Sequence, residues 1–402
     1  MKKQLFPFLL FLLLPAFMFA QSYPSQEQDA YYKQRRKTSH LYYFKKVSLR
    51  TIRNYQNPFF EFRKIDDYTP YVKNDNQPYF SKYLELTFKP GSSIIDKVDE
   101  RQVIRHEKKE NVEAVVYESG WYENYSHGEP GVWVAYSEDY GENWEYYYTG
   151  IVQKQPLYIK GESKHPLINE QGDLQVEACL LRQMKPFMHP GPEPDFQLVK
   201  DGLLLIIDLK TLRKDTDEDG LTDIVEAKFF TDPNNRDTDG DGIPDNQDAN
   251  PRCALPRTEK ASAFETIING DKRIIFRAFI EAEDGSRRDT ILRGEIIPFS
   301  ENPEVQFAKE DTTTVMLVTD DPDLKAIQPH NYRIIVLSEQ EFLKNKKYND
   351  KLDELFMTPM FKVDNEEDTY LIKYSQGTGG NSFLIKRTKD GWWIEIIGGW
   401  IS

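Results

Sequence analysis

The sequence predicts a multidomain protein with a mostly-β N-terminal domain, a short acidic repeat segment as a linker, and an α+β C-terminal domain. The 402 residues exceed one ordinary domain. Short runs rich in Val, Ile, Tyr and Trp fill the first half, as is typical of strands. Residues 211–252 instead repeat an aspartate pattern. The hydrophobic content of 39% suffices for a core, which excludes wholesale disorder.

Residues 1–20 have the pattern of a secretory signal peptide. Two lysines precede an apolar run at 5–19, and the small residue Ala20 ends it before a polar stretch. We expect cleavage near Ala20 and a secreted or periplasmic mature chain. The alternative is an uncleaved anchor helix, although the run is shorter than the roughly 20 residues that a membrane span needs. No later segment reads as a membrane span.

The charge balance limits the partners. With 52 basic and 66 acidic residues the formal net charge is −14, which argues against general nucleic-acid binding because phosphate contacts need a basic face. Residues 30–55, within a basic N-terminal segment at 21–57, carry eight basic and no acidic residues. This stretch is either a solvated, partly extended segment with inward-packed aromatics or an anion-binding face.

Residues 58–210 are expected to form the β-rich domain. The strand-like runs alternate with Gly, Pro and Asn, and a proline-rich stretch at 186–194 must be a loop because proline cannot donate to a strand ladder. The clearest predicted strands are 112–117, 132–136, 144–148, 174–181 and 203–209.

One hairpin motif stands out in this domain. Ser137, Asp139, Gly141 and Trp144 have the spacing Ser-x-Asp-x-Gly-x-x-Trp. The motif resembles the Asp-box of sialidase-like β-propellers, where it is structural and not catalytic. The alternative function is a glycan-active hydrolase that uses this domain as its scaffold. However, about 150 residues are too few for six four-stranded blades, and the family's Arg-Ile-Pro motif is missing.

The acidic segment contains two calcium-loop patterns. In such a loop, oxygen ligands stand at positions one, three, five, nine and twelve, the carbonyl of residue seven adds another, and Gly at six permits the turn. The first predicted ligand set, with Gly220 at position six, is Asp215, Asp217, Asp219, Leu221, Asp223 and Glu226. The second, with Gly242 at position six, is Asp237, Asp239, Asp241, Ile243, Asp245 and Asp248.

The two patterns predict about two bound calcium ions. A non-binding acidic surface loop would have to match the same positions twice, 22 residues apart. Magnesium is disfavoured because a flexible cage of many carboxylates suits the larger ion. Asp248 replaces Glu at position twelve, so its shorter side chain is expected to bind through one oxygen and more weakly. Residues 215–248 hold a net charge of −10, most of the charge of the chain.

Residues 215–248 resemble the aspartate-rich calcium repeats of the thrombospondin type 3 class. The resemblance implies a calcium-filled spacer and makes Asp232 an additional candidate ligand that bridges the loops. With only two loops, a short stiffened linker is expected and not a long rod. An ordinary EF-hand pair is not expected, because residues 211–214 are too short and polar for an entering helix. Residues 224–230 can form two helical turns before Pro233 stops them.

Residues 257–402 are expected to form the α+β domain. Ser338 with Glu341 predicts a capping box for a helix at 338–348. Asp390-Gly391 predicts a hairpin between 382–388 and 392–397. The other predicted strands lie at 273–280, 313–318, 332–337 and 370–374. The aromatic residues Trp392, Trp393 and Trp400 serve either as core residues or as a glycan platform.

No catalytic motif is recognisable, and the six histidines are scattered singly. Cys179 and Cys253 either form a disulfide or remain free thiols. The sequence therefore predicts a calcium-binding protein of structural or binding type, with an unidentified protein or glycan as its partner.

Overall fold

The structure is a computed structural model, and it divides into two compact units. Unit 2 comprises residues 38–261 and 302–354, and unit 1 the remainder. The domain boundaries expected from the sequence stay predictions. The described residues are 25–37, 47–68, 93–95, 98–119, 131–152, 156–184, 196–271, 273–281, 287–292, 295–299, 313–330, 332–345, 353–376 and 379–401.

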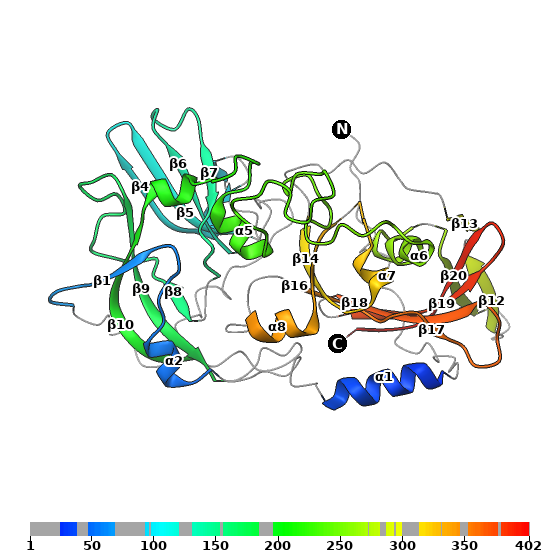
Figure 1. Ribbon diagram of the computed structural model, residues 1–402. Coiled ribbons are helices and arrows are strands. Elements are labelled where there is room, and N and C mark those ends of the chain that lie inside the picture. Colours follow the sequence, from blue (N-terminus) through cyan, green and yellow to red (C-terminus); the bar gives the residue numbers. More distant parts are fainter. Residues whose placement is uncertain are drawn as a thin grey trace. The chain divides into compact units, whose positions relative to one another are not determined.

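Unit 2 contains two four-stranded antiparallel sheets (Figure 1). One has the order β4-β5-β6-β7, formed by Val103–Lys109, Val112–Ser119, Gly131–Ser137 and Glu145–Tyr148. The other has the order β1-β10-β9-β8, formed by Glu61–Lys64, Phe196–Ile207, Leu174–Gln183 and Leu157–Ile159. A short pair, β2 (Ser93–Ile95) and β3 (Val98–Asp99), precedes the 3-10 turn Glu100–Gln102. The prediction of a β-rich region is confirmed.

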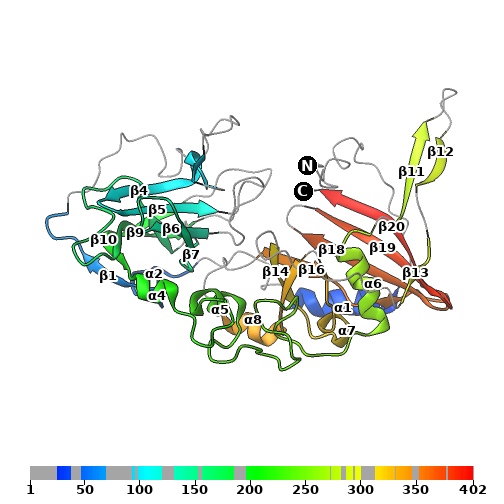
Figure 2. The same cartoon turned by 90° about the horizontal axis from the view of Figure 1, so that it is seen from above.

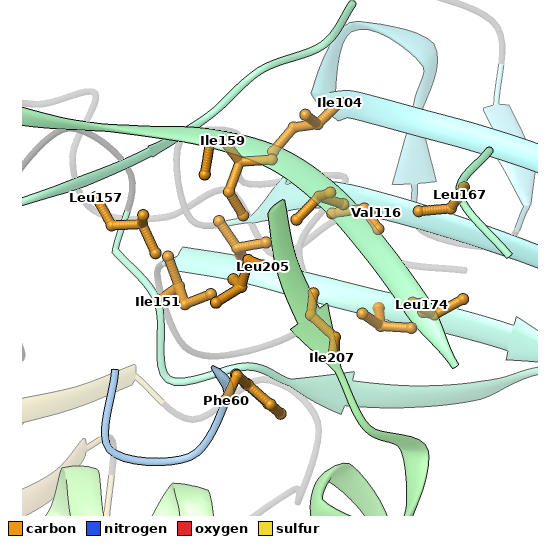
Figure 3. Packing of buried hydrophobic residues seen from close by; sticks show 14 of the residues in the cluster. Phe60, Ile104, Val116, Ile151, Leu157, Ile159, Leu167, Leu174, Leu205 and Ile207 are labelled. Atoms are coloured by element: carbon orange, nitrogen blue, oxygen red, sulfur yellow. The ribbon is translucent and has the colours of Figure 1, made fainter. Parts of the chain in front are cut away.

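One hydrophobic core joins the two sheets (Figure 3). Val116 of β5, Leu174 of β9, and Leu205 and Ile207 of β10 all belong to it and are fully buried. The residues alternate along each strand, so that every second side chain faces the core. Each such aliphatic side chain contributes about 1.5–3 kcal/mol when fully buried.

A short helix precedes the first acidic loop. The prediction that no helix forms there is wrong. α4 (Leu209–Arg213) begins where strand β10 ends, so that Leu209, predicted as strand, is helical. The Asp208 side chain caps this helix by accepting the Lys210 N–H at 3.1 Å. Leu212 is buried in the core of the two sheets. Tertiary burial therefore stabilises a turn that is too short to be stable alone.

The second helix of the acidic segment follows its prediction. α5 (Asp223–Phe229) gives the expected two turns and ends at Phe230, whose φ of +59° is left-handed. Another short helix, α2 (Leu49–Arg53), has Ser48 as its N-cap. These helices lie in unit 2.

The rest of unit 2 is a parallel strand pair with two short helices. β14 (Thr313–Val318) pairs with β15 (Tyr332–Leu337), and α7 (Pro322–Lys325) lies between them in sequence. α8 (Glu339–Asn345) follows. The predicted capping box is confirmed, because Glu341 Oε2 accepts the Ser338 N–H at 2.9 Å and Ser338 Oγ accepts the Glu341 N–H at 3.2 Å. Residues 346–348 of the predicted helix lie outside the described residues.

Unit 1 contains a mixed sheet, seen in a second view in Figure 2. Its strands run in the order β12-β11-β20-β19-β18-β16, with β13 on β20 and β17 on β18. α6 (Glu259–Ile268) begins just before residue 262, where this unit resumes. The strands β11 to β13 and β16 to β20 are Ile275–Glu281, Arg287–Leu292, Ile297–Pro298, Asp353–Met357, Phe361–Lys362, Thr369–Gln376, Gly379–Arg387 and Gly391–Ile401.

The predicted C-terminal hairpin is confirmed by the antiparallel pair β19 and β20. Its turn closes with the Thr388 N–H donating to the Gly391 carbonyl at 2.8 Å. Trp392 is 1% exposed, and its Nε1 donates to Ser262 Oγ at 3.0 Å, so it is a core residue. Trp393 packs in another cluster with Leu384 and its neighbours. The side chain of Trp400 lies outside the described part of the structure.

The N-terminal basic segment is helical in part. α1 (Gln26–Lys37) replaces the extended conformation that was expected there. The Tyr31 ring packs on Phe361 of β17 with centroids 5.2 Å apart, so this helix is packed at Tyr31 and not wholly solvated. Residues 38–46 and the predicted signal peptide lie outside the described residues. Among the described helices, none has the length and apolarity to cross a membrane.

Candidate metal centre

The first aspartate of each acidic loop organises the turn. We name residues 215–226 loop 1 and residues 237–248 loop 2. Asp215 accepts the N–H of Glu218 at 2.9 Å on one oxygen and the N–H of Gly220 at 3.0 Å on the other. Gly220 has a φ of +98°, which explains the need for glycine at position six. The matching bonds in loop 2 join Asp237 to Gly240 and Gly242, both at 2.8 Å.

The next two aspartates continue the curl through backbone bonds. Asp217 Oδ1 accepts the Asp219 N–H at 3.2 Å, and Asp219 Oδ1 accepts the Leu221 N–H at 2.7 Å. In each loop the first three aspartates offer carboxylate oxygens that lie within 4.8 Å of one another and could hold a metal ion. Loop 2 repeats both bonds, with Asp239 accepting from Asp241 at 3.1 Å and Asp241 from Ile243 at 2.8 Å.

The position-nine aspartates bind the chain itself. Asp223 accepts the backbone N–H of Thr216 at 2.9 Å on one oxygen, and the Lys214 ammonium at 2.6 Å on the other. Asp245 likewise accepts the Thr238 N–H at 2.9 Å and its hydroxyl at 2.7 Å. Each carboxylate therefore binds the residue at position two of its own loop, which is Thr216 in loop 1 and Thr238 in loop 2. The role of both residues as metal ligands stays a prediction.

The position-twelve residues bring buried carboxylates to the loops. Glu226 is 0% exposed and Asp248 is 1% exposed. Asp248 Oδ1 accepts the Asn250 N–H at 2.8 Å, so only Oδ2 remains. Glu226 Oε1 has a longer contact, 3.4 Å, with the Thr231 hydroxyl. The Glu226 carboxylate is thus less engaged in hydrogen bonds than the Asp248 carboxylate. The longer side chain of Glu226 also suggests the stronger metal ligand.

Five carboxylate oxygens have no hydrogen-bond partner within the described part of the chain, although all five are buried. A buried acceptor without a partner costs about 1–3 kcal/mol, more when charged. Native proteins rarely leave such groups unsatisfied. A divalent cation in each loop would satisfy them, so the residues present fit a metal. The oxygens are Asp217 Oδ2, Asp219 Oδ2, Glu226 Oε2, Asp239 Oδ2 and Asp248 Oδ2.

The electrostatics of the loops also favour a cation. Burial, with the nearby charges of Asp217 and Asp219, raises the pKa of Glu226 to about 8. Burial, with Asp241 and Asp239, raises the pKa of Asp248 to about 7. These shifts mean that Glu226 and Asp248 release their protons less readily than ordinary carboxylates when no cation is present.

Asp232 does not join either group of converging oxygens found in the described residues. It is exposed, and its Oδ1 accepts the Asn234 N–H at 3.1 Å, as in an Asx turn. Its own N–H donates to the Thr238 hydroxyl at 2.8 Å. Asp232 therefore shapes the connection between the loops, and its predicted bridging role remains untested.

Helix α5 attaches loop 1 to two hydrophobic clusters. Ile224 belongs to the core of the two sheets. Phe230 packs on a smaller cluster that contains Val318 and Leu337 of β14 and β15. The Lys228 ammonium lies 4.4 Å from the centroid of the Tyr148 ring. The acidic segment is thus held on both sides by packing that does not involve an ion.

The predicted Asp-box forms the turn between β6 and β7. The Ser137 hydroxyl donates to Asp139 Oδ1 at 2.7 Å, the Asn143 N–H donates to the same atom at 2.9 Å, and Trp144 Nε1 donates to the Gly141 carbonyl at 3.0 Å. The hydrogen bonds from Asn143 lower the pKa of Asp139 to about 2. These bonds hold the turn together, and the resemblance to an Asp-box stays a prediction.

Sequence reasoning missed one polar cluster of the second sheet. The Lys160 ammonium lies 2.9 Å from Glu177 Oε1 and 2.6 Å from Asp201 Oδ1, and it donates to the Tyr68 hydroxyl at 2.6 Å. These residues are up to 133 positions apart, so no local pattern could have found them. Cys179 lies in the same sheet, and both it and Cys253 are free thiols, so the disulfide alternative is wrong.

Comparison of the chain with known protein families, curated proteins and solved structures finds no match. The loops are therefore interpreted from their own geometry. The structure brings together the first three predicted aspartates of each loop. It engages Asp223 and Asp245 in other bonds. The predicted carbonyl ligands, Leu221 and Ile243, are positioned by their N–H groups on the preceding aspartate.

Proposed function

We propose that this is a secreted or periplasmic calcium-binding protein of structural type, in which about two calcium ions stiffen the segment 215–248. The observation that carries the proposal is the set of five buried carboxylate oxygens that have no partner among the described residues, distributed over two loops with one shared hydrogen-bond pattern. Calcium prefers oxygen ligands of this kind. The periplasmic or extracellular location follows from the signal-peptide pattern of residues 1–20.

We assign each ion to one loop. Carboxylates at positions one, three, five and twelve bind directly, and the position-seven carbonyl completes the cage. Asp223 and Asp245 act through a bound water, as position nine often does in calcium loops. The direct ligands are Asp215, Asp217, Asp219, Leu221 and Glu226 in loop 1, and Asp237, Asp239, Asp241, Ile243 and Asp248 in loop 2.

The ions offset the repulsion between clustered carboxylates. Charges at such separations repel with effective energies of about 1–4 kcal/mol per pair. Two calcium ions bring the net charge of the segment from −10 to −6. Magnesium fits less well because it demands near-ideal octahedral geometry and retains its waters. The bound state is therefore the one in which the loops are both compact and ionised.

Isothermal titration calorimetry of the mature chain tests the proposal. We expect about two calcium ions per chain, and about one in each of the variants Asp217→Asn and Asp239→Asn. Glu218→Gln is the matched control, because it removes one negative charge from position four of loop 1, where the side chain is exposed and is not a ligand. Absence of binding heat at millimolar calcium, with no change in thermal stability, would refute the proposal.

The glycan-hydrolase alternative gains no support from the described residues. It requires two carboxylates about 5–10 Å apart in a pocket. Glu177 and Asp201 are such neighbours in sequence region 58–210, but both bind the Lys160 ammonium and have side chains only 12% and 15% exposed. A carboxylate pair neutralised by a shared lysine maintains the sheet and is poorly suited to act as acid and nucleophile. A glycan or protein partner stays a prediction.

A further inference from the structure

The residues that close loop 2 are bound by an arginine of β15. Arg333 Nη2 donates to the carbonyl of Asn246 at 2.8 Å, and its Nε donates to the carbonyl of Asp248 at 3.3 Å. The guanidinium also lies 5.0 Å from the centroid of the Phe229 ring, at the end of α5. Only a planar fork such as guanidinium reaches two carbonyls in this way.

The same short stretch binds the backbone around α7 and β15. Ala249 O accepts the Ile334 N–H at 2.7 Å. The Asn250 side-chain amide donates to the carbonyls of Lys325 at 2.8 Å and Ile327 at 3.1 Å. Asn250 is fully buried, so these bonds are shielded from water. Residues 246–250 therefore form a clasp, by which we mean the stretch that holds 325–334 through hydrogen bonds.

Asp248 connects this clasp to the metal centre of loop 2. Its Oδ2 is one of the buried oxygens that lack a partner in the described residues, while its Oδ1 accepts the Asn250 N–H. Its main-chain carbonyl accepts from Arg333. A cation on Oδ2 would fix the side chain and, through it, the backbone from which the clasp is made. Without the cation, the negative charge of Asp248 is buried near the other carboxylates of loop 2, and this burial destabilises that conformation.

Loop 1 is attached mainly to the core of the two sheets, and the end of α5 also contacts the β14–β15 cluster through Phe230. It follows α4, where Arg213 Nη2 lies 2.6 Å from Glu145 of β7. It leads into α5, where Ile224 packs in the core of the two sheets. The apolar core holds this side of the segment whether or not metal is present. The stretch 325–334 contains the buried residues Ile327 and Ile334, and its polar bonds go to residues 246–250 at the end of loop 2.

We propose that calcium in loop 2 controls the docking of α7 and β15 onto the acidic segment, with Arg333 as the positioning residue. This inference rests on the proposed calcium binding and deepens it. The ion in loop 2 orders Asp248, Asp248 orders residues 246–250, and these hold the 325–334 stretch. Loss of the ion frees that stretch, while the two-sheet core stays folded.

Hydrogen exchange of the full mature chain, resolved to single amides, tests the inference. We expect the Ile334 N–H, which is bonded to Ala249 O, to exchange about tenfold or more faster in chelator than in saturating calcium. The Val176 N–H, in the buried strand β9, should change little and serves as the internal reference. The Asp239→Asn variant should accelerate exchange of the Ile334 N–H even in calcium. The Asp217→Asn variant should accelerate it much less.

A second variant separates the clasp from the metal. Arg333→Lys keeps the charge but loses the fork, so it should accelerate Ile334 exchange in saturating calcium while calorimetry still finds two ions. Arg63→Lys, at an exposed position in β1, is the matched control. Two bound ions with Ile334 exchange unaffected by chelator would overturn the inference and leave the proposed function standing. Absence of calcium binding would overturn both.

Discussion

Asp139 in the β6–β7 turn and Glu226, where loop 1 runs into helix α5, are both acidic residues, but their surroundings are opposite. Asp139 is partly exposed to solvent, and its carboxylate accepts hydrogen bonds from Ser137 and Asn143. Glu226 is completely buried, and its Oε2 has no partner in the described chain. The Asp139 pKa falls to about 2, whereas the Glu226 pKa rises to about 8.

The difference shows how to separate two kinds of carboxylate in an acidic sequence. Some are satisfied by hydrogen bonds within the fold, and others could bind a cation. A turn aspartate that is fully hydrogen-bonded is stable as an anion with no further partner. A buried acid among other acids is not, and it either binds a proton or a metal. Within the loops the same contrast separates Asp223 and Asp245, which bind their own threonines, from Asp217 and Asp239.

Removal of calcium should have the largest effect. Each site filled at 100 times its Kd stabilises the folded chain by about 2.7 kcal/mol, so two sites contribute about 5 kcal/mol. Urea unfolding in calcium and in chelator measures the difference. The urea midpoint in magnesium alone should stay near the chelator value. Equal midpoints in calcium and chelator would show that the buried carboxylates are satisfied without metal.

Substitution of a single aspartate should distinguish the acidic loops from the β6–β7 turn. Asp217→Asn should remove one calcium site and about 2.7 kcal/mol of the calcium-dependent stability. Asp139→Asn should lower the melting temperature equally in calcium and in chelator, because the β6–β7 turn loses acceptor bonds but no metal. Calorimetric stoichiometry distinguishes them. A reduced calcium count in Asp139→Asn would contradict the division made here.

The pH dependence should run in opposite directions for the two kinds of acid. Raised folded-state pKa values of Glu226 and Asp248, about 8 and about 7, mean that the metal-free folded state binds protons more tightly than the unfolded state. Their contribution to stability is present below the unfolded pKa values, about 4, and is lost as pH rises through about 7 to 8. Asp139, with its pKa of about 2, contributes above about pH 4 and loses this as pH falls.

Metal-free protein should therefore melt at a lower temperature at pH 8 than at pH 5, and the gain from calcium should be greater at pH 8. Melting curves in chelator and in calcium at both values measure this. Glu226→Gln should flatten the metal-free dependence, because glutamine does not titrate. A metal-free melting temperature that rises over this range would contradict the burial of these acids.

The smallest expected effect is the difference in calcium affinity between loop 1 and loop 2. Glu226 has the longer side chain and only a 3.4 Å contact from the Thr231 hydroxyl on Oε1, while Asp248 Oδ1 is held by the Asn250 N–H at 2.8 Å. We expect the site in loop 1 to bind about tenfold more tightly, equivalent to about 1.4 kcal/mol. Titration of Asp239→Asn, which retains loop 1, against Asp217→Asn, which retains loop 2, measures each Kd. A tighter site in Asp217→Asn would reverse the assignment.

Local patterns in the sequence determined much of this protein. The aspartate spacing with glycine at position six identified both loops because ligands two residues apart face one centre in a curled chain. The Ser338–Glu341 capping box and the Asp390-Gly391 turn were predictable for the same reason, since each involves neighbours in sequence. Most predicted strands agree with the structure within a few residues, but β10 begins at Phe196, seven residues before its predicted start, and ends before Leu209.

Tertiary structure decided the rest. Helix α4 forms because the core buries Leu212, and α1 forms where Tyr31 meets Phe361, more than 300 positions away. The clasp joins Asn246 and Arg333, 87 residues apart. Whether an aspartate is a metal ligand or a turn residue depends on burial and on the donors that surround it, and these are set when distant segments pack. Spacing alone could name the acids but not divide their roles.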